Sequence, residues 1–372
     1  MNRSHRATPV LAVVVLVGSL LTALLWAPAA GAEPQQPTAH ASAVQKKTKK
    51  RRPKPIYWGA WIGDQINGVN PPFDMGGVSI LQTLVGKGLS LIQFSSPFYD
   101  CHVSPCAPYE FPNEPMENIR GYGAIPFFSW GSESSPGHPE NFRLADLAAG
   151  REDPYITQFA QEAREWGHPF FLRFDWEMNG SWFPWSEGVN GNTAAGYIAA
   201  WRHVHDVFTA VGATNATWVW CPFADANSAY TDMKTLYPGN AYVDWTCLDG
   251  YNWGRNGVKA RPWRTFDEIF AGSYRYLTTK VARRKPVLLA ELASGTRGGH
   301  KALWIKEMLS PLPRNYPKVR GFIWLDAFDR GIDWPIETSP KATAAFAKGI
   351  AKGVYQPNRY AELNVSPIPP QP

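Results

Sequence analysis

The chain has few of the residues on which several common chemistries depend. Among its 372 residues there are four cysteines and eight histidines. No CxxC pair and no HExxH motif occurs, which argues against the usual zinc sites. A GxSxG segment is also absent, as a serine hydrolase of the α/β type would need, and no glycine-rich phosphate turn follows the first apolar run. We therefore expect no metal and no cofactor.

Charge is likewise sparse. Asp, Glu, Lys and Arg together make up 18% of the chain, whose formal net charge is +6. Most of the excess positive charge lies in the segment 46–54, which holds seven Lys and Arg residues, so the rest of the chain is nearly neutral. An enzyme that acts on nucleic acid carries a basic face. We therefore expect no nucleic-acid partner.

Aromatic residues, by contrast, are abundant. The chain contains 17 Trp, 15 Tyr and 19 Phe, and 44% of its residues are hydrophobic. We expect most of these rings to be large core residues, because buried aromatic side chains dominate core energetics. Their number nevertheless exceeds what a core requires, and exposed flat rings are what a protein uses to stack on sugars or nucleobases.

The first 54 residues differ from the rest. Arg3 and Arg6 precede an apolar run from Val10 to Trp26 and a small-residue site, which predicts a signal peptide over residues 1–32 and a secreted protein. An uncleaved membrane anchor is the alternative, because the run is at the short end of what spans a bilayer. Residues 33–54 lack large apolar groups and should form a disordered basic linker. Such a linker could contact an anionic polymer of the cell envelope.

From residue 55 onward, eight short apolar runs rich in β-branched and aromatic residues alternate with stretches of helical patterning. The runs begin at Ile56, Leu89, Gly123, Pro169, Ala216, Asp244, Lys285 and Val319. Strands that are apolar nearly throughout, each followed by a helix, favour an α/β fold with a closed (β/α)8 barrel over a doubly wound sheet. We predict this barrel over residues 55–360, a flexible tail over 361–372, and a monomer.

The four cysteines fit an oxidising destination. Cys101 and Cys106 bracket a tight loop that a disulfide could close. Four cysteines allow three pairings. Their placement in the barrel favours Cys221 with Cys247 as the second pair.

Two glutamates close apolar runs at positions where a barrel enzyme carries its chemistry. Active sites of such barrels lie at the carboxyl ends of the strands; Glu177 ends the fourth run and Glu291 the seventh, so they should face each other across the mouth. Either one alone could merely accept hydrogen bonds at a helix start. As a pair they match glycosidic bond cleavage, in which one carboxyl protonates the leaving oxygen while the other attacks the anomeric carbon or activates water.

Further residues occupy the same strand ends. Arg173 should pair with a carboxylate, either in catalysis or as a structural salt bridge inside the barrel, and Tyr251 is placed to hydrogen-bond the nucleophile. We expect the aromatic residues there to contact sugars, together with Asn179 close to Glu177. The predicted substrate-binding set is Trp130, Arg173, Asn179, Trp182, Trp185, Tyr251, Trp253 and Trp324.

The segment RFDWEMNGSWFPW, residues 173–185, resembles the acid/base segment of glycoside hydrolase family 26, which contains β-mannanases, mixed-linkage glucanases and β-1,3-xylanases. TWVWCPF, VDWTCLDGYNW, KPVLLAELAS and FIWLDAFDRGIDWPIETSP are similar to later strands of the same barrel. The resemblance covers residues 55–350. It implies retaining hydrolysis, with Glu177 as acid/base, Glu291 as nucleophile and Tyr251 as the partner of the nucleophile.

One departure from the family concerns the substrate. Mannanases of the family usually carry His immediately before the acid/base glutamate, whereas this chain has Trp176. An indole can only donate a hydrogen bond, while an imidazole can also accept one. We expect an endo-β-glycanase for β-1,4-linked polysaccharide, with β-mannan as the first choice and mixed-linkage β-glucan or β-1,3-xylan as alternatives. A non-catalytic barrel that binds glycans at the cell surface is a further possibility.

Overall fold

The computed structural model describes residues 52–137, 143–224, 230–255 and 262–370. The chain divides into two compact units, Met1–Lys50 and Arg51–Pro372, and every described residue belongs to the second. The predicted signal peptide and all but the last three residues of the predicted linker lie outside the described residues. No helix in the described part is long and apolar enough to cross a membrane.

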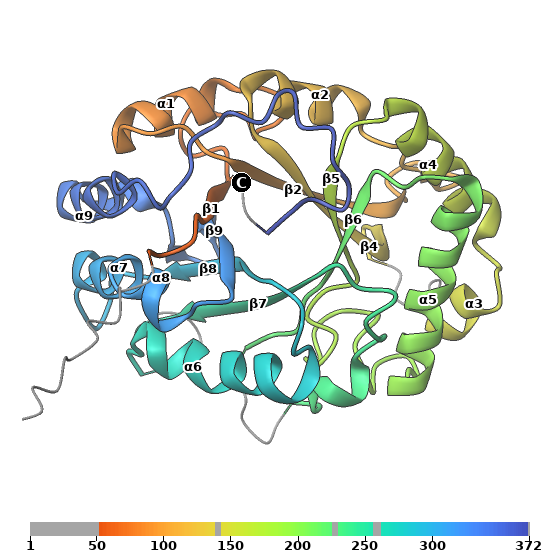
Figure 1. Ribbon diagram of the computed structural model, residues 1–372. Coiled ribbons are helices and arrows are strands. Elements are labelled where there is room, and N and C mark those ends of the chain that lie inside the picture. Colours follow the sequence, from red (N-terminus) through yellow and green to blue (C-terminus); the bar gives the residue numbers. More distant parts are fainter. Residues whose placement is uncertain (1–51, 138–142, 225–229, 256–261, 371–372) are drawn as a thin grey trace, which may run out of the picture. The chain divides into compact units, whose positions relative to one another are not determined.

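Eight parallel strands form a closed barrel, and helices surround it (Figure 1). The barrel closes because β1 pairs with both β2 and β9. The strands are β1 (Tyr57–Ile62), β2 (Leu91–Asp100), β4 (Ile125–Ser135), β5 (Phe170–Phe174), β6 (Ala216–Trp220), β7 (Trp245–Asn252), β8 (Val287–Ser294) and β9 (Val319–Asp326). Each of the eight predicted apolar runs overlaps one of these strands, which confirms the (β/α)8 barrel.

Helices connect the strands, and their ends follow from local sequence. The side-chain oxygens of Thr193 and Thr265 accept backbone N–H bonds at the starts of α5 and α6, and Gly167 ends α4 in the left-handed conformation that glycine adopts without strain. The helices are α1 (Gly76–Val85), α2 (Asn113–Tyr122), α3 (Leu144–Ala148), α4 (Asp153–Trp166), α5 (Ala194–Val211), α6 (Phe266–Tyr276), α7 (Lys301–Leu309), α8 (Leu312–Asn315) and α9 (Pro340–Ile350). Three short strands lie outside the barrel: β3 (Ala107–Pro108), β10 (Phe328–Asp329) and β11 (Ile332–Asp333).

Side chains alternate between two apolar cores, because successive residues of a strand point to opposite faces. Inward-pointing residues such as Leu91, Phe127 and Phe171 fill the barrel, while outward-pointing residues pack against the helices. Toward the carboxyl ends of the strands the inward positions become polar. This polar layer consists of Gln93, Ser129, Arg173, Asp249 and Glu291.

Both predicted disulfides are present. Cys101 pairs with Cys106 in the loop between β2 and β3, and Cys221 pairs with Cys247. Cys221 directly follows β6 and Cys247 lies in β7, so the second disulfide joins two neighbouring strands inside the barrel.

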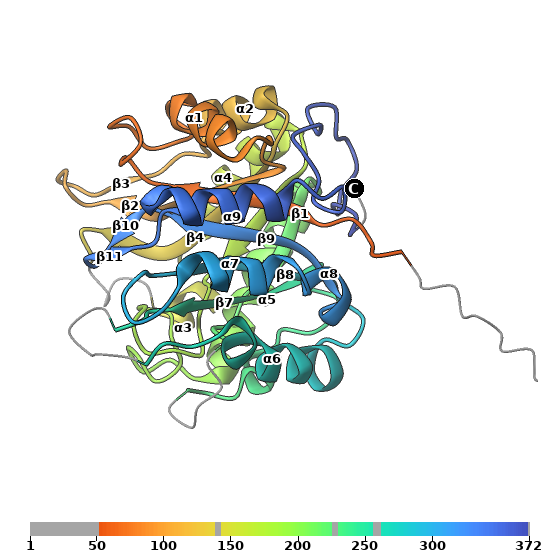
Figure 2. The same cartoon turned by 90° about the vertical axis from the view of Figure 1, so that its left-hand side faces the viewer.

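The end of the chain differs from the predicted flexible tail. Ile368 is 1% exposed and belongs to the core inside the barrel. Its amide donates to Thr217 Oγ1 and its carbonyl accepts from Trp245 Nε1, both at 2.9 Å. Residues 361–370 therefore dock onto the barrel at the end opposite β10 and β11 (Figure 2). The proline-rich composition suggested a free tail, but one apolar side chain inserted into the barrel is enough to anchor it.

Candidate active site

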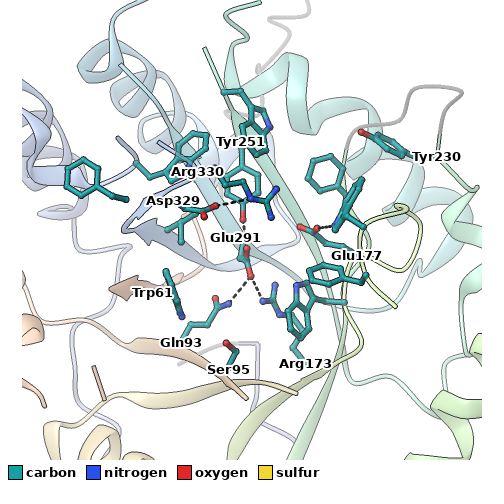
Figure 3. A pocket seen from close by; sticks show the side chains of 18 residues that line it. Trp61, Gln93, Ser95, Arg173, Glu177, Tyr230, Tyr251, Glu291, Asp329 and Arg330 are labelled. Carbon is teal, nitrogen blue, oxygen red and sulfur yellow. Dashed lines mark hydrogen bonds and ion pairs between the residues drawn. The ribbon is translucent and has the colours of Figure 1, made fainter. Parts of the chain in front are cut away.

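A cleft at the carboxyl ends of the strands contains both predicted glutamates (Figure 3). Glu291 lies within β8, and Glu177 lies three residues beyond the end of β5. A carboxylate oxygen of Glu177, one of Glu291 and one of Asp249 all lie within 4.8 Å of one another. The fold thus places three carboxyl groups from distant parts of the sequence close together.

A tight turn after β5 aims Glu177 into the cleft. Asp175 and Glu177 both adopt left-handed backbone conformations, with φ of 38° and 53°, which cost energy for residues other than glycine. Contacts from neighbouring strands hold this turn. The carboxylate of Asp175 accepts from the amide and hydroxyl of Ser132 at 2.8 and 2.7 Å, and the amide of Glu177 donates to the carbonyl of Cys221 at 2.7 Å.

Glu291 is surrounded by hydrogen-bond donors. Arg173 and the hydroxyl of Tyr251 donate to its two carboxylate oxygens, and Gln93 donates at 3.1 Å. The guanidinium of Arg173 is 1% exposed and also binds Asp249 at 2.8 Å. Both the charge and the orientation of the Glu291 carboxylate are therefore fixed from three other strands of the barrel.

The two glutamates differ in their affinity for a proton. Burial, and then the nearby charge of Glu291, raise the pKa of Glu177 to about 8. Burial alone would also raise the pKa of Glu291, but the charge of Arg173 and the donated hydrogen bonds outweigh it and hold that pKa below the usual range. At neutral pH the site therefore holds a protonated Glu177 beside an ionised Glu291. Burial also raises the pKa of Tyr251 far above its usual value, so its phenol remains a donor.

Four of the predicted substrate-binding residues line this cleft: Arg173, Trp182, Tyr251 and Trp253. Trp182 is 39% exposed. Its indole N–H donates to Glu177 Oε2 at 2.5 Å, and its ring meets Phe223 and Tyr230 edge to face. Trp182 thus both orients the acid and presents an aromatic surface beside it.

The other four predicted substrate-binding residues lie outside the cleft lining, so their assignment is wrong. Trp130 and Trp324 point outward from the barrel, where they pack on helices α4 and α7 through Phe159 and Trp304. Trp185 is fully buried, and its N–H donates to the carbonyl of Trp176. Asn179 uses its amide to bind the backbone of Phe223, which links two loops of the site.

Several cleft residues were not predicted from the sequence. Trp176 lines the cleft, and the centre of its ring lies 4.7 Å from the guanidinium carbon of Arg173. Asp249, which is buried beneath the cleft lining, could have been found, since it lies two residues before Tyr251 and must point to the same side of β7. The remaining lining residues are Trp61, Gln93, Ser95, Phe183, Phe223, Tyr230, Leu325, Phe328, Asp329, Arg330 and Trp334.

A (β/α)8 barrel whose mouth brings a protonated and an ionised carboxyl group together, beside aromatic rings, has the arrangement that glycosidic bond cleavage requires. The sequence profile described as glycosyl hydrolase family 26 matches residues 151–288. Over this segment, which includes Glu177, the chain is similar to that family.

Two curated relatives are similar to this chain in sequence, and solved structures are similar to it in fold. Endoglucanase H of Acetivibrio thermocellus is 34% identical over 302 residues, which make up 80% of this chain but 31% of that protein. Beta-1,3-xylanase TXYA of a Vibrio species is 26% identical over 121 residues, 31% of this chain and 25% of that protein. The chain therefore spans a third or less of the curated relatives it matches. A GH26 β-mannanase structure from Bacteroides ovatus shares the fold, with a TM-score of 0.55, 16% identity, and coverage of 82% of this chain and 91% of that chain.

Proposed function

We propose that this chain is a retaining endo-β-glycanase with Glu291 as nucleophile and Glu177 as general acid/base. The separation of the two carboxyl groups carries the proposal. Retaining enzymes hold them roughly 5 to 5.5 Å apart and inverting enzymes roughly 6.5 to 9.5 Å. One carboxylate oxygen of Glu177 and one of Glu291 lie within 4.8 Å of each other, which supports the closer, retaining arrangement. The unequal pKa values of the pair support the same division of roles.

The reaction then proceeds in two displacements. Glu291, held ionised by Arg173, attacks the anomeric carbon, while Glu177 donates its proton to the departing glycosidic oxygen. Because Trp182 occupies Oε2 of Glu177, Oε1 is the oxygen that carries the proton toward the substrate. The same glutamate, now ionised, takes a proton from water, which releases the sugar from Glu291 with its original configuration.

Attack on internal bonds requires sugar contacts on both sides of the carboxyl pair. Trp182 binds Glu177. Tyr230 lies on the same side of Glu291 as Glu177, whereas Trp61 lies on the other side (Figure 3). Aromatic faces on both sides of the scissile bond support endo action.

For the substrate we propose a β-glucan that contains β-1,4 linkages, in place of the β-mannan that the sequence motifs favoured. Endoglucanase H is 34% identical to this chain, whereas the mannanase structures share only the fold. Trp176, in place of the histidine usual in mannanases, supports the same choice. β-Mannan and β-1,3-xylan remain outcomes of the test.

The test incubates the purified chain with barley-type β-glucan, β-mannan and β-1,3-xylan and measures new reducing ends. We expect the greatest rate on β-glucan. Glu291→Ala should abolish hydrolysis, and azide should partly restore cleavage, which is detected as a glycosyl azide of inverted configuration and not as a new reducing end. No new reducing ends on any of the three polymers would refute the proposed function.

We also propose that the protein is exported, with residues 1–32 as its signal peptide and 33–54 as a linker. The two disulfides support an oxidising compartment. Expression with the leader and sequencing of the mature amino terminus tests this proposal; a chain that stays in the cytoplasm with its leader intact contradicts it.

A further inference from the structure

Lys301, the first residue of α7, is a buried cation that takes no part in the mechanism above. Its side chain is 4% exposed. The ammonium donates to the backbone carbonyls of Asp333, Trp334 and Pro335 at 2.9, 2.8 and 2.6 Å, and to Thr338 Oγ1 at 3.1 Å. All four acceptors are uncharged. An ammonium has three donors and no acceptor, so this one is fully used to bind a single short segment.

The charge of Lys301 does not serve stability. Burial lowers its pKa to about 8, although the charges of Asp333, Asp326 and Glu337 raise it. The folded state therefore binds this proton less tightly than the unfolded chain, and the buried charge reduces stability at neutral pH. We therefore examine the segment that the ammonium binds for the role of Lys301.

We call residues 333–338 the anchored segment. Besides Lys301, two residues of β9 and one residue after β8 bind it. Trp324 of β9 donates from Nε1 to the carbonyl of Trp334 at 2.9 Å, and Asp326 accepts from the amide of Ile336 at 2.6 Å. Thr296, in the loop after β8, donates from its amide and its hydroxyl to the carboxylate of Asp333.

The anchored segment reaches the catalytic residues through Trp334. This ring lines the cleft and packs on the rings of Tyr251 and Trp253 at centroid distances of 5.4 and 5.3 Å. The hydroxyl of Tyr251 in turn binds Glu291. Trp334, whose carbonyl accepts from the ammonium, is therefore linked to the carboxylate of Glu291 by two contacts, one to Tyr251 and one from Tyr251 to Glu291.

We propose that Lys301 is a positioning residue whose ammonium fixes the anchored segment, so that Trp334 holds Tyr251 and Glu291 in the geometry of attack. The proposal rests on the proposed function. Above a pH of about 8 the ammonium loses one of its three protons together with its charge. The segment then loses a donor, and activity should fall as the pH rises through this value.

The test compares Lys301→Met with Lys306→Met, a matched control on the exposed face of the same helix. Dinitrophenyl β-cellobioside is the substrate, because its leaving group needs no proton from Glu177 and its rate reports on Glu291. We expect Lys301→Met to lower kcat/KM by about 10- to 100-fold, since displacements of about 1 Å have effects of this size. Its pH profile should lack the decline above about pH 8 that the parent protein and Lys306→Met show.

Hydrogen–deuterium exchange of peptides that cover residues 326–340 provides a readout independent of activity. We expect faster exchange there in Lys301→Met and also in Thr296→Val, which loosens the same segment should the lysine variant fail to fold. Unchanged exchange in folded variants, or faster exchange with unchanged kcat/KM, overturns the proposal. If the parent protein cleaves none of the substrates while exchange increases as expected, the proposed function fails and the anchoring by Lys301 stands.

Discussion

Removing the negative charge of Glu291 should lower the pKa of Glu177. Burial is the largest cause of its raised value of about 8, and the charge of Glu291 is the second. With oxygens within 4.8 Å and an effective dielectric constant of about 20, two unit charges repel each other by roughly 3 kcal/mol. This energy corresponds to about a hundredfold change in the affinity of Glu177 for its proton.

The proposed reaction requires the same fall in the pKa of Glu177. Formation of the glycosyl ester consumes the charge of Glu291, so Glu177 should release its proton when the second displacement needs a base. Two species reproduce this state: the Glu291→Gln variant, and the parent protein trapped with a 2-deoxy-2-fluoro glycoside. We expect a lower pKa for Glu177 in both than in the free parent protein.

Carbon-13 NMR titration of labelled glutamate side chains measures this directly, with Glu177→Gln used to assign the resonance. The control is Glu165→Gln, which removes an exposed carboxylate on α4 and should leave the Glu177 titration unchanged. If Glu177 titrates in Glu291→Gln as it does in the parent protein, burial alone sets its pKa. The electrostatic division of roles between the two glutamates would then be wrong.

Three further predictions follow from other contacts. Tyr251→Phe removes a hydrogen bond that lowers the pKa of Glu291, so the acidic limb of the kcat/KM profile should move to higher pH. The value of kcat should fall by about 10- to 100-fold, as expected for the loss of about 1.5 to 3 kcal/mol. A pH profile like that of the parent protein contradicts this prediction. Trp176→His should raise the ratio of β-mannan to β-glucan hydrolysis, and an unchanged ratio removes this residue from the argument about substrate. Ile368→Ala should lower the free energy of unfolding, measured in urea, by about 2 to 5 kcal/mol and leave kcat unchanged. An unaltered urea midpoint would mean that the docked end of the chain adds no stability.

The sequence was sufficient for the barrel and for the two carboxylates, because both depend on local patterns. Apolar runs of strand length, separated by amphipathic stretches, leave few alternatives to a barrel once there are eight of them. Glu177 and Glu291 were found because a charged residue that ends such a run must lie at the barrel mouth. The disulfide between Cys221 and Cys247 follows from the same placement.

The tryptophan predictions failed where the direction of the side chain was ignored. Trp130 follows Ser129, which points inward to Arg173, so a period of two residues already sends Trp130 outward to the helices. Trp185 lies in a loop, where no such periodicity applies, and its burial depends on Trp176 and Phe183 packing over it. Counting along the strand could therefore have corrected the prediction for Trp130, while the burial of Trp185 required the folded loop.

The orientation of Glu177 is the part of the site that no single segment determines. Its left-handed conformation is held by the carbonyl of Cys221, and that of Asp175 by Ser132. Each contact joins strands whose sequences show no sign of the other. A motif therefore locates the acid along the chain, but the distance to Glu291 that separates retention from inversion arises only when neighbouring strands close around the turn. Ser132→Ala, which removes a donor to Asp175 and leaves both glutamates in place, disturbs that distance without touching the motif.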